Sequence, residues 1–135
     1  MSAGRRALAA AHQAIGVRFR LHGRDPASGL DCVGLALLAM RAGGFSGAVP
    51  ADYALRGGDA LAIAAQIDAR GLLRVTDNGL PGDLILCASG PAQLHFAIQA
   101  QDGVIHADLM LRRVVHRPGA VPWRIISRWR LPDME

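Results

Sequence analysis

The chain has 135 residues, of which 51% are hydrophobic, so it is long enough for one domain with a buried core. Its two cysteines are too few for a disulfide framework and lack the short paired spacing of a zinc site. The formal net charge is +4, but all 15 basic residues are arginines scattered along an alanine- and glycine-rich chain, so the charge does not by itself indicate a nucleic-acid partner.

The chain begins with a predicted amphipathic helix over residues 5–15, because Leu8, Ala11 and Ile15 share one face. Polar residues interrupt this stretch, so it does not match the core of a signal peptide. No apolar run approaches the ~20 residues that span a bilayer. We therefore expect a protein made and folded in the cytoplasm as one domain, residues 1–135, without nucleic-acid or membrane partners.

A second predicted helix lies in GLDCVGLALLAM and begins with an acid and a cysteine. Asp31 is a candidate cap, which places Cys32 among the unpaired amides of the first turn. That setting favours negative charge, so Cys32 is a candidate nucleophile ionised near neutral pH. Gly34 permits close approach of another backbone, and the apolar run predicts a buried helix. On this segment alone, the alternative is a capped core helix with an inert cysteine.

A third helix is predicted near residues 59–70, with Asp59 as its cap. The hydrophobic period then changes from helical to two, and LLRV is either a strand or a turn. Five further segments are predicted strands: PGDLILC, LHFAIQA, GVIHA, RRVVHR and WRIISRWR. The last is expected at a sheet edge, with Trp123 and Trp129 on a packed face and arginines on the other. Helices followed by antiparallel strands predict an α+β fold.

A cysteine nucleophile needs a base, and the chain has five histidines. Two of these, His95 and His106, lie on neighbouring predicted strands. A two-residue Asp-Gly turn would separate them by more than ~10 Å along the strands, whereas a four-residue loop places them diagonally, with β-carbons roughly 7 Å apart. We adopt the four-residue loop, residues 100–103, although Asp-Gly alone favours the tight turn. The other three histidines lie in surface or loop contexts; these are His12, His22 and His116.

These residues form a candidate Cys-His-His set. Ala97, between the two histidines on their shared face, is small enough to leave room for the tip of the cysteine-bearing helix. A zinc site built from Cys32, His95 and His106 is chemically possible. The cysteine at a helix N-terminus explains the same residues without a metal, and we favour that interpretation.

The motifs GLDCVGLALLAM, PGDLILC, LHFAI and GVIHADL occur in the order and at the spacing of the NlpC family of cell-wall cysteine peptidases. The resemblance covers the chain from the first helix to at least Val115. It implies a minimal papain-like α+β fold, with N-terminal helices packed on an antiparallel sheet and the nucleophile at a helix N-terminus. The compact length is most similar to versions encoded among phage tail or gene-transfer-agent genes.

The resemblance also implies roles for the three reactive residues. Cys32 would be the nucleophile, His95 the base and His106 the third, orienting residue. The Cys32 backbone N–H would supply part of an oxyanion hole. The implied reaction is hydrolysis of an amide bond in the peptidoglycan stem peptide, usually after γ-D-glutamyl, through an acyl-enzyme and without metal or cofactor.

Four residues are candidates for substrate binding. Asp31 would contact the substrate as well as cap its helix. Family members commonly carry an upstream tyrosine that binds the developing oxyanion, and Phe19, which has no hydroxyl, stands at the nearest position here. His22 or Arg20 would compensate for that hydroxyl. Tyr53 would border the substrate cleft or pack against its loop.

Without an export signal, such an enzyme would reach the wall from outside, carried in a phage-like tail with tail or baseplate hub proteins as partners. An alternative is a tail-tip assembly protein that keeps the fold but has lost catalysis, which Phe19 favours. A third class is another acyl-transfer enzyme on the same scaffold.

Overall fold

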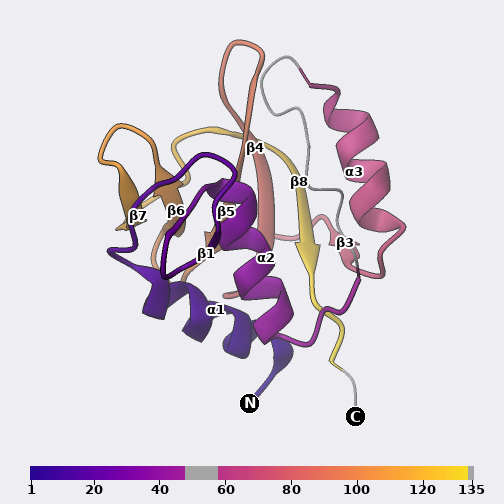
Figure 1. Ribbon diagram of the computed structural model, residues 1–135. Helices are drawn as coiled ribbons and strands as arrows, with labels where there is room; N and C mark the ends of the chain where they lie inside the picture. The colour runs from indigo at the N-terminus through magenta and orange to yellow at the C-terminus, as the bar shows by residue number, and fades with distance from the viewer. Residues whose placement is uncertain (48–57, 134–135) are drawn as a thin grey trace.

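A computed structural model describes residues 1–47 and 58–133 of the chain (Figure 1). In this part of the chain no helix is long and apolar enough to cross a membrane. The described helices and strands are α1 (Ala3–Ala14), β1 (Arg24–Asp25), β2 (Gly29–Leu30), α2 (Cys32–Ala42), α3 (Ala60–Asp68), β3 (Leu73–Val75), β4 (Leu84–Gly90), β5 (Gln93–Gln99), β6 (Val104–Asp108), β7 (Arg113–Arg117) and β8 (Arg124–Arg130).

Six strands form one antiparallel sheet in the order β3-β8-β4-β5-β6-β7, and β1 pairs with β2 in the loop before α2. In Figure 1, α2 lies in front of the sheet, α1 runs beneath it, and α3 lies beside β3. Helix α2 packs against β5 and β6, and α1 packs against α2. The predicted α+β class is therefore confirmed.

The principal core fills the space between the helices and one face of the sheet. Side chains alternate along a strand, so every second residue of β4 and β5 points into this core. A smaller apolar cluster lies on the opposite face, around Ile85, Cys87, Ala97 and Val104. Cys87 is fully buried there, as expected for a core cysteine.

The three helices begin where side chains satisfy their first amides. The Asp31 carboxylate accepts a hydrogen bond from the Gly34 N–H, and Asp59 caps α3, as predicted. Helix α1 begins two residues earlier than expected, because the Ser2 hydroxyl accepts from the Arg5 N–H. LLRV contains the short strand β3.

The prediction for WRIISRWR is wrong in two respects. Strand β8 lies between β3 and β4 rather than at an edge. It also carries a bulge in which Ile126 has no partner on β4, so the alternation of side chains reverses. Trp129 therefore packs in the principal core, whereas Trp123 packs on the opposite face, against the smaller cluster.

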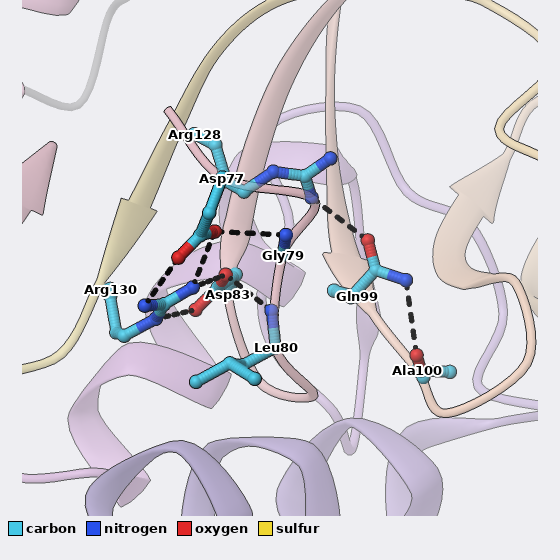
Figure 2. A network of polar contacts seen from close by, with 8 residues as sticks. All are labelled: Asp77, Gly79, Leu80, Asp83, Gln99, Ala100, Arg128 and Arg130. Carbon is cyan, nitrogen blue, oxygen red and sulfur yellow. Dashed lines mark hydrogen bonds and ion pairs between the residues drawn. The ribbon is translucent and has the colours of Figure 1, made fainter. Parts of the chain in front are cut away.

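A polar network ties together the starts and ends of the three central strands (Figure 2). The buried Asp83 carboxylate, in the PGDLILC motif, accepts from the Nε and Nη2 of Arg130 at 3.0 and 2.9 Å. Arg130 also pairs with Asp77 at 2.9 Å. Arg128 donates to the side-chain oxygen of Gln99 at 2.9 Å. These bonds fix β4 and β8 to the end of β5, the strand that carries His95.

Candidate active site

Cys32 is the first residue of α2 and is 7% exposed. Backbone N–H groups of Phe96 and Val33 lie close enough to its sulfur to stabilise a negative charge there. The last paired residues of β5 and β6, counted from the loop that joins them, are Ile98 and Ile105. Beyond this pair, the first backbone N–H of β5 that points toward β6 is that of Phe96. The sulfur therefore lies where the two strands part, beside the residue that follows His95.

The start of α2 is held by the carboxylate of Asp31. One oxygen, Oδ1, accepts from Gly34 N–H at 2.8 Å and from Arg24 Nη1 at 2.7 Å. The other, Oδ2, accepts from the His22 N–H at 2.8 Å. A β-carbon at Gly34 would lie 2.0 Å from the carbonyl oxygen of Gly23, so the loop contacts the helix backbone directly. Asp31 thus fixes both the helix and the loop that approaches the site.

The two candidate histidines meet as predicted. The register of β5 and β6 leaves a four-residue loop, closed by a hydrogen bond from Ala100 N–H to the Gly103 carbonyl at 2.9 Å. The Nε2 of His95 lies 3.0 Å from the Nδ1 of His106, and the ring planes are 88° apart. This contact occupies one nitrogen of His95 and leaves its Nδ1 as the other possible proton acceptor.

Trp123 was not identified as a site residue from the sequence. Its ring packs edge-on against both imidazoles, with centroids 5.1 Å from His95 and 4.8 Å from His106. His106 is 4% exposed. The indole therefore shields the histidine pair from water. The bulge at Ile126 brings Trp123 to the face of the sheet that carries the two histidines. No pattern in the sequence predicted that bulge.

Asp108 was also missed, although it lies within the quoted motif GVIHADL. It follows His106 by two residues, so strand alternation places both on one face. Its Oδ2 lies 4.0 Å from the Nε2 of His106. Its Oδ1 accepts from the N–H groups of Met110 and Leu111 at 2.8 and 3.2 Å.

Burial sets the protonation of the site. It raises the pKa of the Cys32 thiol to about 11, which outweighs the stabilising N–H of Phe96. It lowers the pKa of His95 to about 4, and that of His106 in the same direction. At neutral pH the thiol of Cys32 and both imidazoles are therefore uncharged. The expectation that the helix terminus ionises the thiol near neutral pH is wrong for this resting arrangement.

The predicted substrate-binding residues have different positions. Phe19 is half-buried and packs against the principal core, while its backbone pairs with Leu30. His22 contributes its backbone N–H to Asp31, and its side chain is exposed. Tyr53 lies outside the described residues.

The zinc alternative finds no support in the described part of the chain, 1–47 and 58–133. No three His, Cys, Asp or Glu side chains of these residues come together in an arrangement that could hold a metal ion. What the geometry does assemble is a thiol at a helix N-terminus and a hydrogen-bonded histidine pair on the adjacent strands. Such an arrangement is able to perform nucleophilic acyl transfer.

Solved structures similar to this chain are NlpC/P60 domains. NlpC1 from Trichomonas vaginalis has a TM-score of 0.71 and 21% identity over 96% of this chain and 45% of its own. NlpC2 from the same organism has a TM-score of 0.68 and 19% identity over 96% of this chain and 47% of its own. The NlpC/p60 domain of the peptidoglycan hydrolase SagA has a TM-score of 0.62 and 23% identity over 95% and 98% of the two chains.

The chain thus spans about half the length of the two Trichomonas proteins and nearly all of the SagA domain. No protein-family model and no curated protein matches the sequence. At these identities the comparison establishes the fold, which is that of NlpC/P60 domains, and the expected papain-like class is confirmed.

Proposed function

We propose that this chain is a cysteine peptidase that hydrolyses an amide bond of the peptidoglycan stem peptide, on the carbonyl side of γ-D-glutamyl. The observation that carries the proposal is Cys32 at the start of α2, with the backbone N–H of Phe96 at its sulfur, together with the hydrogen-bonded pair of His95 and His106. The SagA domain, which has the same fold, comes from a peptidoglycan hydrolase.

In the proposed reaction, His95 accepts the thiol proton of Cys32 on Nδ1, because His106 occupies Nε2. The sulfur attacks the carbonyl carbon, and the Cys32 backbone N–H stabilises the oxyanion that forms. The imidazolium then protonates the leaving amine. Water, deprotonated by His95, hydrolyses the thioester and releases the free thiol.

Digestion of purified peptidoglycan tests this proposal, with the two cysteines as a matched pair. Both are buried and unbridged. We expect Cys32→Ala to abolish the release of stem-peptide fragments and Cys87→Ala to retain it, with both variants folded by circular dichroism. Mass spectrometry of the fragments identifies the bond, expected after γ-D-glutamyl. A wild-type chain that releases nothing, or equal release by Cys32→Ala, contradicts the proposal.

We further propose that the protein, made in the cytoplasm, is carried to the wall in a phage-like tail, in contact with tail or baseplate hub proteins. The turn between β6 and β7 supports a protein contact, because Leu109, Met110 and Leu111 are 65%, 89% and 56% exposed. Immunodetection in purified particles tests this. Particles that deliver DNA but lack the chain would refute tail carriage.

A second candidate function is a tail-tip assembly protein without useful catalysis. Two observations favour it: Phe19 offers no hydroxyl to an oxyanion, and burial holds the pKa of Cys32 at about 11. Particles carrying Cys32→Ala discriminate the two functions. Delivery equal to that of wild-type particles selects the assembly protein, and loss of delivery with normal incorporation selects the peptidase.

A further inference from the structure

The contact between His95 and His106 leaves one question open, which is the direction of the hydrogen bond. Each neutral imidazole has one N–H and one bare nitrogen, so either ring is able to donate. The rings are held at 3.0 Å through the Nε2 of His95 and the Nδ1 of His106. The position of a single proton therefore decides the tautomer of both rings.

The two directions have opposite chemical consequences. If His106 donates from Nδ1, then Nε2 of His95 accepts and the proton of His95 sits on Nδ1, which then has no lone pair for the thiol proton. If His95 donates from Nε2, its Nδ1 is bare and able to act as a base. Proton abstraction from Cys32 needs the second arrangement, in which His106 carries its proton on Nε2.

We propose that Asp108 is a positioning residue that selects this second arrangement, by attracting the proton of His106 to Nε2. This inference rests on the proposed peptidase function for its catalytic meaning. The Asp108 Oδ2 lies 4.0 Å from Nε2, the ring nitrogen that does not contact His95. An aspartate that fixes a histidine tautomer in this way affects rate without touching the substrate.

Asp108 is itself held in place for this role. Its Oδ1 accepts two backbone N–H groups of the following turn, from Met110 and Leu111, which leaves Oδ2 directed at the ring. The side chain of Asp108 is 22% exposed and that of His106 is 5% exposed, so solvent screens their interaction only in part.

Trp123 and Arg117 also lie near His106, but neither offers a proton acceptor to its Nε2. Trp123 presents an uncharged ring to the imidazole. Arg117, on the neighbouring strand β7, disfavours a positive charge on His106, whereas Asp108 favours one. Arg117 therefore helps to keep His106 neutral, and Asp108 decides where the single proton of the neutral ring lies.

The test is ¹⁵N NMR of the imidazole nitrogens in the wild-type chain, in Asp108→Asn and in Asp25→Asn. An asparagine at 108 keeps the oxygen that accepts the turn amides but presents its NH₂ group to His106, which reverses the preference. Asp25 is the matched control, because its Oδ1 also accepts a turn amide, from Ala27 at 2.9 Å, and within the described residues it has no hydrogen bond or ion pair with a histidine.

We expect a protonated Nε2 and a bare Nδ1 on His106 in the wild type and in Asp25→Asn. Asp108→Asn should show the reverse, and its peptidoglycan digestion should fall on the order of 10²-fold, as for supporting partners of a functional histidine. A wild-type His106 protonated on Nδ1, or tautomers unchanged in Asp108→Asn, overturns the inference.

The two readouts separate this inference from the proposed function. Tautomers that reverse in a chain without peptidase activity would reject the peptidase and retain the assignment of Asp108. Peptidase activity that persists in Asp108→Asn with unchanged tautomers would reject Asp108 and retain the peptidase.

Discussion

Acidification should destabilise this protein through His95 and His106 before its carboxylates contribute. His95 has a pKa of about 4 in the folded chain, because burial disfavours its charged form, against 6.5 for an unperturbed histidine. Between these values the unfolded chain binds a proton that the folded chain does not. The free energy of unfolding therefore falls as the pH falls from 6.5 to 4, and His95 contributes no pH dependence above that window.

The size of the effect follows from the same two values. A difference of about 2.5 pKa units at ~1.4 kcal/mol per unit gives a loss of about 3 kcal/mol by pH 4. His106 acts in the same direction. The pKa values of Asp68 and Asp77 lie below the usual carboxyl range, because Trp129 and Arg130 respectively donate to them, so their contribution is lost at lower pH.

Urea unfolding at pH 7.0, 5.5 and 4.5 measures this slope. His95→Gln removes the titrating ring, so its unfolding free energy should fall less steeply, by on the order of 1 kcal/mol per pH unit. His12→Gln, at an exposed ring on α1, is the control for replacing an imidazole by an amide. Parallel slopes for His95→Gln and the wild type would show that burial of this ring does not resist its protonation.

Three substitutions test how the site is held. Asp31→Asn should cost about 2 kcal/mol by urea unfolding, since both carboxylate oxygens accept hydrogen bonds. Asp59→Asn should cost under ~0.5 kcal/mol, because both hydrogen bonds that Asp59 accepts from residues 58–133 go to Oδ1, which asparagine keeps; equal costs would contradict this. Gly34→Ala should cost more than ~2 kcal/mol by the same measurement, despite the better helix propensity of alanine. The reason is that the added β-carbon would lie 2.0 Å from the carbonyl oxygen of Gly23, and a neutral or stabilising effect would refute that contact. Trp123→Ala should raise the pKa of His95, measured by NMR titration, because it admits water to the ring; an unchanged pKa would show that the indole does not shield it.

Much of the fold followed from local signals. Asp31 and Asp59 each precede an apolar helical run, and both cap a helix. The choice of a four-residue loop depended on one functional argument, that two histidines in a single hairpin should meet, and the register of β5 and β6 bears it out. Local caps and strand alternation are set by neighbouring residues, which is why a single sequence predicts them.

The missing parts depend on contacts between distant segments. The bulge at Ile126 inserts one residue and reverses the faces of β8, which turns Trp123 toward the histidines. Nothing in WRIISRWR distinguishes that arrangement from regular alternation. The pKa of Cys32 likewise reflects burial by the whole core. The helix terminus considered alone therefore predicted a lowered pKa, whereas burial raises it.

The pKa values of Cys32 and His95 also bear on when these two side chains become charged. The pKa values of Cys32 and His95, about 11 and about 4, differ by about 7 units, so moving the proton between them costs ~10 kcal/mol before attraction is counted. Even two opposite charges in direct contact, ~4 Å apart, would offset only about 4 kcal/mol of this at an effective dielectric constant of ~20. An isolated ion pair is therefore unfavourable at rest, so in the proposed reaction proton transfer would accompany attack on the substrate. If the chain is the proposed peptidase, the amides at the start of α2 would act chiefly on the oxyanion of the transition state, where negative charge develops, rather than on the resting thiol.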